Sequence, residues 1–230
     1  MACRPVARKP RSRSPGSVAA RASAPSPERA EQAVRDLLSA LGLDPAHPAL
    51  EDTPRRTSEA FLEVLTVGYA EDPLTALGKG FPAKSSTPLL ALDIPLLFTC
   101  PHHLMPARGR AHVALLPRER VPGLSRISRL IDVLGHRLVL QEDLTADIVE
   151  ALQAGLGVAA AVAVVEARHT CVAIEDFARC ETVFRTRARV GPAASCASLE
   201  AEIDASLRSP WPTSASEPTA APRASRSRSR

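Results

Sequence analysis

Two short clusters of cysteine and histidine are the strongest candidates for chemistry in this sequence. The first is Cys100-Pro101-His102-His103, and the second, far along the chain, is His169-Thr170-Cys171. Thiolate sulfur and imidazole nitrogen are the usual protein ligands of zinc. The Cys100-x-x-His103 spacing allows one turn to present two ligands to the same ion. Together the clusters could therefore supply the ligands of one metal site.

The residue types alone leave three interpretations of these clusters open. A catalytic zinc site takes three protein ligands and leaves a position for water, whereas a structural site takes four and closes. Cys100, His103 and Cys171 would make three, with His102 and His169 beside the ion as acid–base groups. In the third interpretation these are unrelated buried residues, because free cysteine is among the most buried residue types.

The clusters lie at the ends of predicted strands. Apolar runs predict strands at residues 87–99, 110–116, 157–168, 170–177 and 183–190. His169 and Cys171 would then be two residues apart on or beside a strand, so their side chains would share one face.

Helix start signals precede the other periodic apolar segments. Ser26-Pro27 and Thr53-Pro54 each place a capping residue before a proline, which predicts a helical pair within residues 26–70. Ser125 and Thr145 are predicted to cap two further helices, each followed by apolar residues at helical spacing.

The order of these elements predicts the fold class. Residues 71–86 contain Pro, Gly, Lys and Ser and predict a loop. A helical pair, two strands, two helices and further strands do not alternate as βα units do. The sequence therefore predicts an α+β protein with an antiparallel sheet, in which residues 71–190 form the domain that carries both candidate catalytic clusters.

The positive net charge of +4 comes from the two ends of the chain. Residues 1–30 carry seven basic residues and one acid, and residues 205–230 carry five and one. The middle, residues 31–204, carries 17 basic and 23 acidic residues. We predict that residues 1–25 form a disordered basic tail and that residues 191–230 are largely disordered, since neither end shows apolar periodicity.

Composition also excludes several classes of protein. The middle of the chain is acidic and aromatic residues make up only 3% of the total, which argues against nucleic-acid binding. No apolar run is long enough to span a membrane, so we expect no membrane partner. The N-terminus lacks the apolar core of a secretory signal, and we expect a cytoplasmic protein with reduced cysteines. The Arg- and Ser-rich N-terminus also fits an organellar transit peptide.

Three stretches together resemble the GTP cyclohydrolase I family. They are LEDTPRRTSEAF, FTCPHHLMPARGRAHVALLPRERVPGLSRISRLIDVLGHRLVLQEDLT and EARHTCV, and the similarity covers about residues 30–174. The pairing of C-x-H-H with a distant H-x-C, with GLS and QE-x-LT between them, is highly specific.

The resemblance implies a fold, an assembly and a reaction. The fold is a tunnelling fold, an antiparallel sheet backed by two helices, and the chains form rings that stack into a homodecamer with active sites between subunits. The reaction opens the guanine imidazole ring of GTP, releases formate and gives 7,8-dihydroneopterin triphosphate, in pteridine and tetrahydrofolate biosynthesis. The zinc ligands match Cys100, His103 and Cys171, and the histidines matching His102 and His169 transfer protons.

The resemblance also implies the substrate contacts. Gln141 and Glu142 match a pair that binds the purine, where a carboxylate can accept from the guanine N1–H and N2–H₂ groups. Ser125, Arg126 and Arg129 match positions that hold the triphosphate, and Arg56 matches a further phosphate contact.

The sequence departs from the family at the phosphate end. Glu59 replaces a lysine, and Glu175-Asp176 replaces an Arg-Gly pair, so two cations have become anions. Pro101 replaces a residue that is often glutamate. These departures leave open an alternative function: a diverged paralogue that acts on a purine with fewer phosphates, or a non-catalytic ring partner.

Overall fold

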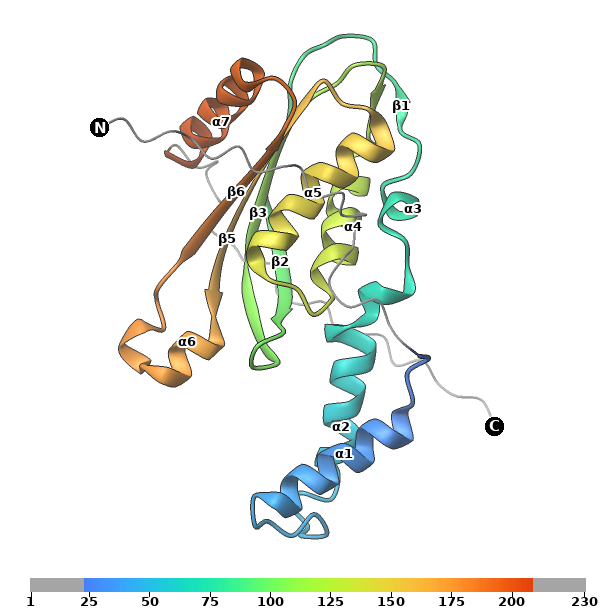
Figure 1. The fold of residues 1–230 in the computed structure, drawn as a ribbon, viewed down its shortest axis with the longest axis vertical. Helices are drawn as coiled ribbons and strands as arrows, with labels where there is room; N and C mark the ends of the chain where they lie inside the picture. Colours follow the sequence, from blue (N-terminus) through green and yellow to red (C-terminus); the bar gives the residue numbers. More distant parts are fainter. Residues whose placement is uncertain (1–22, 209–230) are drawn as a thin grey trace, which may run out of the picture.

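A four-stranded antiparallel sheet lies at the centre of the computed structural model, which describes residues 23–208 (Figure 1). The predicted tails therefore lie mostly outside the described residues. The elements are α1 (Pro27–Ala40), α2 (Thr53–Glu59), η1 (Ala60–Leu65), η2 (Val67–Ala70), α3 (Pro73–Leu77), β1 (Phe81–Pro82), β2 (Leu89–Cys100), β3 (Met105–Leu116), β4 (Arg120–Val121), α4 (Leu124–Gly135), α5 (Gln141–Leu156), β5 (Ala160–His169), α6 (Thr170–Glu175), η3 (Phe177–Arg179), β6 (Phe184–Val190) and α7 (Ala193–Arg208).

The strands of the sheet follow in the order β2-β3-β5-β6, each antiparallel to its neighbour. The short strands β1 and β4 pair separately. Strand β5 is apolar on both faces: Ala161, Ala163 and Val165 belong to one buried cluster, and Val162 and Val164 belong to another. Its continuous apolar run is thus explained by helices on both sides, because successive side chains of a strand point to opposite faces.

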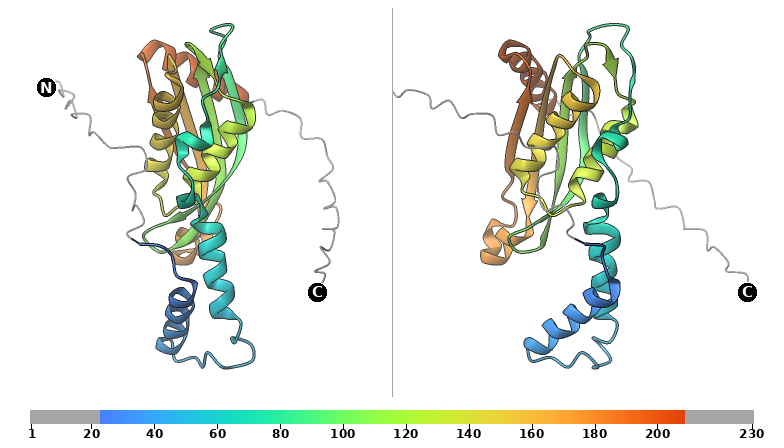
Figure 2. Two further views of the ribbon diagram at one scale, coloured as in Figure 1. Left: turned by 90° about the vertical axis from the view of Figure 1, so that its right-hand side faces the viewer. Right: turned by 45° about the vertical axis from the view of Figure 1, so that its right-hand side comes forward.

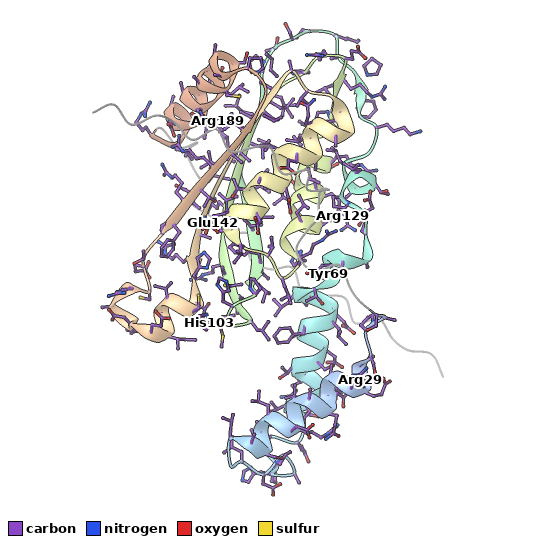
Figure 3. All side chains as sticks on the ribbon, viewed as in Figure 1. Arg29, Tyr69, His103, Arg129, Glu142 and Arg189 are labelled. Carbon is purple, nitrogen blue, oxygen red and sulfur yellow. The ribbon has the colours of Figure 1, made fainter. Side chains whose placement is uncertain are left out.

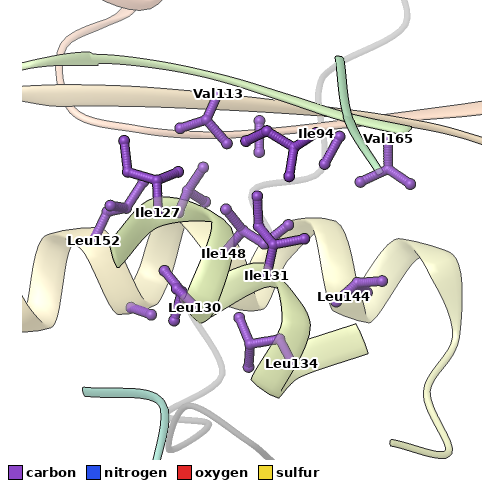
Figure 4. Packing of buried hydrophobic residues seen from close by; sticks show 14 of the residues in the cluster. Ile94, Val113, Ile127, Leu130, Ile131, Leu134, Leu144, Ile148, Leu152 and Val165 are labelled. Carbon is purple, nitrogen blue, oxygen red and sulfur yellow. The ribbon is translucent and has the colours of Figure 1, made fainter. Parts of the chain in front are cut away.

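Helices α4 and α5 cover one face of the sheet with a closely packed apolar layer (Figure 4). Ile127, Leu130 and Ile131 of α4 recur at helical spacing and are fully buried, as are Ile148 and Leu152 of α5. Burying each such side chain stabilises the fold by roughly 1.5–3 kcal/mol. This is the predicted arrangement of two helices on an antiparallel sheet, and it confirms the α+β fold class.

The predicted N-terminal helical pair is present as α1 and α2. Ser26 caps α1 by accepting a hydrogen bond from the Arg29 backbone N–H at 3.3 Å, and Pro27 occupies the first turn. The pair extends beyond the end of the sheet (Figure 2). Leu37 on α1 and Leu41, the residue that follows the helix, are more than half exposed. Within the described residues, no helix is long and apolar enough to cross a membrane.

Four local predictions were wrong because longer-range contacts or unrecognised caps decide them. Asp52, not Thr53, precedes α2, and its side chain makes no capping hydrogen bond. The predicted loop at 71–86 contains α3, capped by Asp72, whose carboxylate accepts from the Thr75 N–H at 2.8 Å. Gly123, not Ser125, precedes α4. Thr145 lies inside α5, where its hydroxyl donates to the Gln141 carbonyl at 2.6 Å.

Residues 170–177 do not form the predicted strand. The β3–β5 pairing ends at Ala107 and His169, and the β5–β6 pairing ends at Ala167 and Phe184. Because β3 extends only to Met105, Val172 and Ile174 have no strand to pair with, and the chain turns into α6 although these two residues alternate as strand residues do.

The C-terminal range 191–230 is not largely disordered in its described part, because residues 193–208 form α7. Cys196, Leu199 and Ile203, spaced three and four residues apart, are buried. They pack in one cluster with Val162 and Val164, on the sheet face opposite α4 and α5. This three-residue apolar stripe was the missed signal in the sequence.

We predict that Ile203→Ala destabilises the protein by about 2–5 kcal/mol, because it leaves a cavity between α7 and the sheet. Urea unfolding followed by circular dichroism measures the loss. Leu207→Ala, at a partly buried position of the same helix, serves as the control and should cost less. An Ile203→Ala midpoint equal to that of the wild type would show that α7 adds nothing to stability.

Candidate active site

The candidate site lies at the end of the sheet where β2 and β5 finish. Cys100 is the last residue of β2, His169 is the last residue of β5, and Cys171 lies in the first turn of α6. Ala107 pairs with Phe98 on one side and with His169 on the other, so the strand register places β2 and β5 within reach of each other. The two sequence clusters, about 70 residues apart, therefore meet.

Cys100, His169 and Cys171 form a group that can hold a metal ion. One ligand atom from each lies within 4.8 Å of the others. Two sulfurs bonded at about 2.3 Å to one zinc ion lie within about 4.6 Å of each other, so the spacing fits. Burial raises the pKa of the Cys171 thiol, and the neighbouring Cys100 raises it further. A bound cation would oppose both effects by stabilising the thiolates.

Both histidines of the first cluster, His102 and His103, lie on the exposed turn between β2 and β3. His102 lines the pocket beside the cysteines, whereas His103 is not part of the group formed by Cys100, His169 and Cys171. His169 thus occupies the place in this group that the resemblance implied for His103.

Two aromatic rings and an amide surround the His169 imidazole. Phe98 and Phe184 each make an edge-on contact with it, with ring centroids 5.4 Å apart. Its Nε2 lies 2.8 Å from Gln141 Oε1. Burial lowers the pKa of His169, and the negative charge of Glu142 partly opposes this effect.

A pocket of about 360 Å³ brings six of the predicted site residues together. Besides the cysteines and His169, it is lined by His102, Gln141 and Glu142. Three residues of β6 that were not predicted also line it, namely Phe184, Arg185 and Thr186. Their proximity depends on the β5–β6 pairing, and nothing in the FRT sequence marks them locally.

The predicted phosphate contacts do not line this pocket. Arg126 donates to the Ala76 carbonyl at 3.3 Å, and Arg129 forms an ion pair with Glu71. Figure 3 shows Arg129 near Tyr69 and well separated from Glu142 and His103. Ser125 is exposed in the first turn of α4. Arg56, on α2, pairs with Asp52 at 2.8 Å.

Both departures in charge lie on exposed surfaces. Glu59 accepts two hydrogen bonds from Arg55 at 2.8 Å, one turn earlier on α2. Glu175 and Asp176 end α6, and Asp176 pairs with Arg179 at 3.0 Å. Each acid other than Glu175 therefore has an arginine partner within its own segment.

These features define an α+β protein whose antiparallel sheet, backed by two helices, carries a Cys–His–Cys site at one end. The family model described as GTP cyclohydrolase I matches residues 30–208. The chain belongs to this family and has its tunnelling fold, and it is a GTP cyclohydrolase I-like hydrolase of the pteridine pathway.

Several relatives named GTP cyclohydrolase 1 are similar over most of the chain. The protein from Mycobacterium marinum is 40% identical over 183 residues, which cover 78% of this chain and 90% of the relative. The protein from Corynebacterium aurimucosum is 38% identical over 184 residues, which cover 79% and 93%. The protein from Campylobacter lari is 39% identical over 165 residues, which cover 71% and 86%.

We predict that Cys171→Ser weakens binding of Zn²⁺ by more than about 100-fold, beyond the 10–100-fold typical of losing an outer partner of a metal ligand. Competition with a chromophoric chelator measures the affinity. Cys180→Ser is the matched control, because Cys180 is a nearby free cysteine outside the ligand group. Equal affinities of the Cys171→Ser variant and the wild type would exclude Cys171 as a ligand.

Proposed function

We propose that the protein catalyses the zinc-dependent hydrolytic opening of the guanine imidazole ring of GTP, which releases formate and forms 7,8-dihydroneopterin triphosphate. The observation that carries this proposal is the single pocket shared by Cys100, Cys171, His102, His169 and Glu142. It combines soft metal ligands, two imidazoles and a carboxylate, which can activate water, transfer protons and bind a purine edge.

The ligands in this proposal are Cys100, His103 and Cys171, the set implied by the resemblance. Zinc bound there would supply a water-derived nucleophile at neutral pH. His103 follows Cys100 by three residues on an exposed turn, so a movement of this turn would carry its imidazole toward the thiols. The zinc titration used for Cys171 also tests the third ligand: His103→Ala should lose the metal, whereas His169→Ala should retain it.

The remaining residues of the pocket bind the purine and move protons. The purine is proposed to lie against the Gln141–Glu142 segment, where the exposed Glu142 carboxylate can accept from N1–H and N2–H₂. His102, at the pocket rim, and His169, at its wall, are the proposed proton-transfer groups. A positioned group of this kind contributes about 10²–10⁴-fold to the rate.

The triphosphate is assigned to Ser125, Arg126, Arg129 and Arg56. None of them lines the pocket of the described chain, which supports a site completed by a neighbouring copy. Self-association, in the rings that the resemblance implies, and a cytoplasmic location are parts of this proposal. Exposed apolar side chains, including Leu41 and the 82% exposed Phe177, are available for contacts between copies.

One observation favours a second candidate, in which the substrate is a purine with fewer phosphates. Glu59 and Glu175 place negative charge where the family carries cations. Glu59 also accepts a hydrogen bond from Arg55, which engages that guanidinium within α2. Unit charges about 4 Å apart near a protein surface interact by about 4 kcal/mol before screening, so these exchanges weaken triphosphate binding if they face it.

The test of the proposed function is to incubate zinc-loaded protein with GTP, GMP and guanosine. Formate and pterin fluorescence are measured as products. We expect both from GTP, with lower kcat/KM for the other two purines. A preference for GMP or guanosine would support the second candidate, and no formate from any of them would overturn both.

We predict that Glu59→Lys combined with Glu175→Arg raises kcat/KM for GTP by about tenfold or more, because each change restores a favourable charge toward the triphosphate. Steady-state kinetics at low GTP measures the gain. Glu51→Lys combined with Glu150→Arg adds the same charge at other exposed positions and serves as the control. Equal gains in the two variants would mean that Glu59 and Glu175 do not face the phosphates.

A further inference from the structure

The side-chain amide of Gln141 has its orientation determined by the sheet beneath it. Its Nε2 lies 3.1 Å from the Val165 carbonyl oxygen and 2.9 Å from the Phe184 carbonyl oxygen. A carbonyl oxygen can only accept a hydrogen bond, so the group that faces both must be the NH₂ and not the oxygen. The reversed amide would place its oxygen against two other oxygens.

The amide oxygen of Gln141 is therefore the atom that faces His169. It lies 2.8 Å from His169 Nε2, and it can only accept. A hydrogen bond at this distance requires the hydrogen to be on Nε2. This holds for the neutral and for the cationic ring, and in the neutral ring it leaves Nδ1 as the unprotonated nitrogen.

Two hydroxyl groups complete the network in a way that agrees with this assignment. Gln141 Nε2 also lies 3.2 Å from Thr186 Oγ1, and Thr186 Oγ1 lies 2.6 Å from Thr145 Oγ1. Thr145 donates to the Gln141 backbone carbonyl at 2.6 Å. Thr145 gives its one hydroxyl hydrogen to the Gln141 carbonyl, so Thr186 donates to Thr145 and every hydroxyl hydrogen has one acceptor. The two amide hydrogens of Gln141 point to the Val165 and Phe184 carbonyls, and Thr186 Oγ1 shares one of them.

We propose that Gln141 is a positioning residue that holds His169 with its hydrogen on Nε2 and leaves Nδ1 free, and that its side chain does not contact the purine. Gln141 is buried, and both ends of its amide are engaged within the chain. A purine contact would have to replace one of these bonds. Glu142, next along α5, has an exposed side chain and remains the purine contact.

The residues around the His169 ring divide two roles: the aromatic side chains hold the ring in place, and the Gln141 amide selects its tautomer. Phe98 and Phe184 both contact the imidazole edge-on, so we expect the ring to keep its place when the hydrogen bond is lost. Without the Gln141 amide, the neutral His169 ring could then carry its hydrogen on either nitrogen. The role in turnover rests on the proposed function, whereas the tautomer does not.

The first experiment reads the tautomer in the wild-type chain, without substrate and without metal. The protein is labelled with ¹⁵N on the histidine rings and its solid-state NMR spectrum is recorded above the pKa of His169. The signals of His169 are identified by their absence in His169→Gln. We expect a protonated Nε2 and an unprotonated Nδ1. The opposite tautomer, or an equal mixture, would overturn the proposal whether or not the protein acts on GTP.

The second experiment separates positioning from substrate binding. In Gln141→Leu we expect the single His169 tautomer to be lost, with kcat reduced about 10–100-fold and KM for GTP changed less than about twofold. Gln153→Leu makes the same substitution at an exposed position of α5 and should behave as the wild type. A raised KM with unchanged kcat and an unchanged His169 spectrum would show that Gln141 binds the purine and would overturn the proposal. If Gln141→Leu does not fold, the wild-type spectrum still decides the tautomer.

Discussion

The burial of β5 on both faces is the constraint on which the rest of the structure depends. Its Ala and Val side chains meet α4 and α5 on one side and α7 on the other. A shift of the observed register by one residue would exchange the two faces and place Val162 and Val164 where Ala161 and Ala163 now pack under α4 and α5, which would overpack that layer. This register also determines where the strand ends, which is at His169.

The site follows from where the pairing stops. Beyond His169 the chain has no strand neighbour and turns into α6, which brings Cys171 back toward Cys100 at the end of β2. At the same edge, the Gln141 side chain bonds to carbonyls of β5 and β6 and to the His169 ring. The first residue of α5 thus connects the covering helix, the sheet and the candidate catalytic group.

The ion pairs between the arginines of β6 and the acids of α7 contribute less to stability than the apolar contacts beneath them. Arg187 pairs with Asp204 on α7 at 2.7 Å, and Arg189 pairs with Glu200 at 3.7 Å. Exposed ion pairs contribute about 0–1 kcal/mol each. Burial of Leu199 and Ile203 contributes more, so apolar packing holds α7 on the sheet while the ion pairs cover its edge. The abundance of arginine in this strand does not by itself indicate an anion site.

The sequence by itself determined those features that depend on residue type and on neighbours a few positions apart. The Ser26 cap of α1, the apolar stripes of α4 and α5, and the run of β5 predicted the α+β fold, and the Cys–His clusters predicted a metal site. Tertiary structure alone decided that α6 is a helix, since Val172 and Ile174 have a strand pattern but no strand to pair with. It also decided that His169, and not His103, lies with the two thiols, and that the Gln141 amide serves His169. The contacts of His169 with Cys100 and with Gln141 join residues more than 20 positions apart, and local periodicity carries no information about which distant groups the packed sheet brings together.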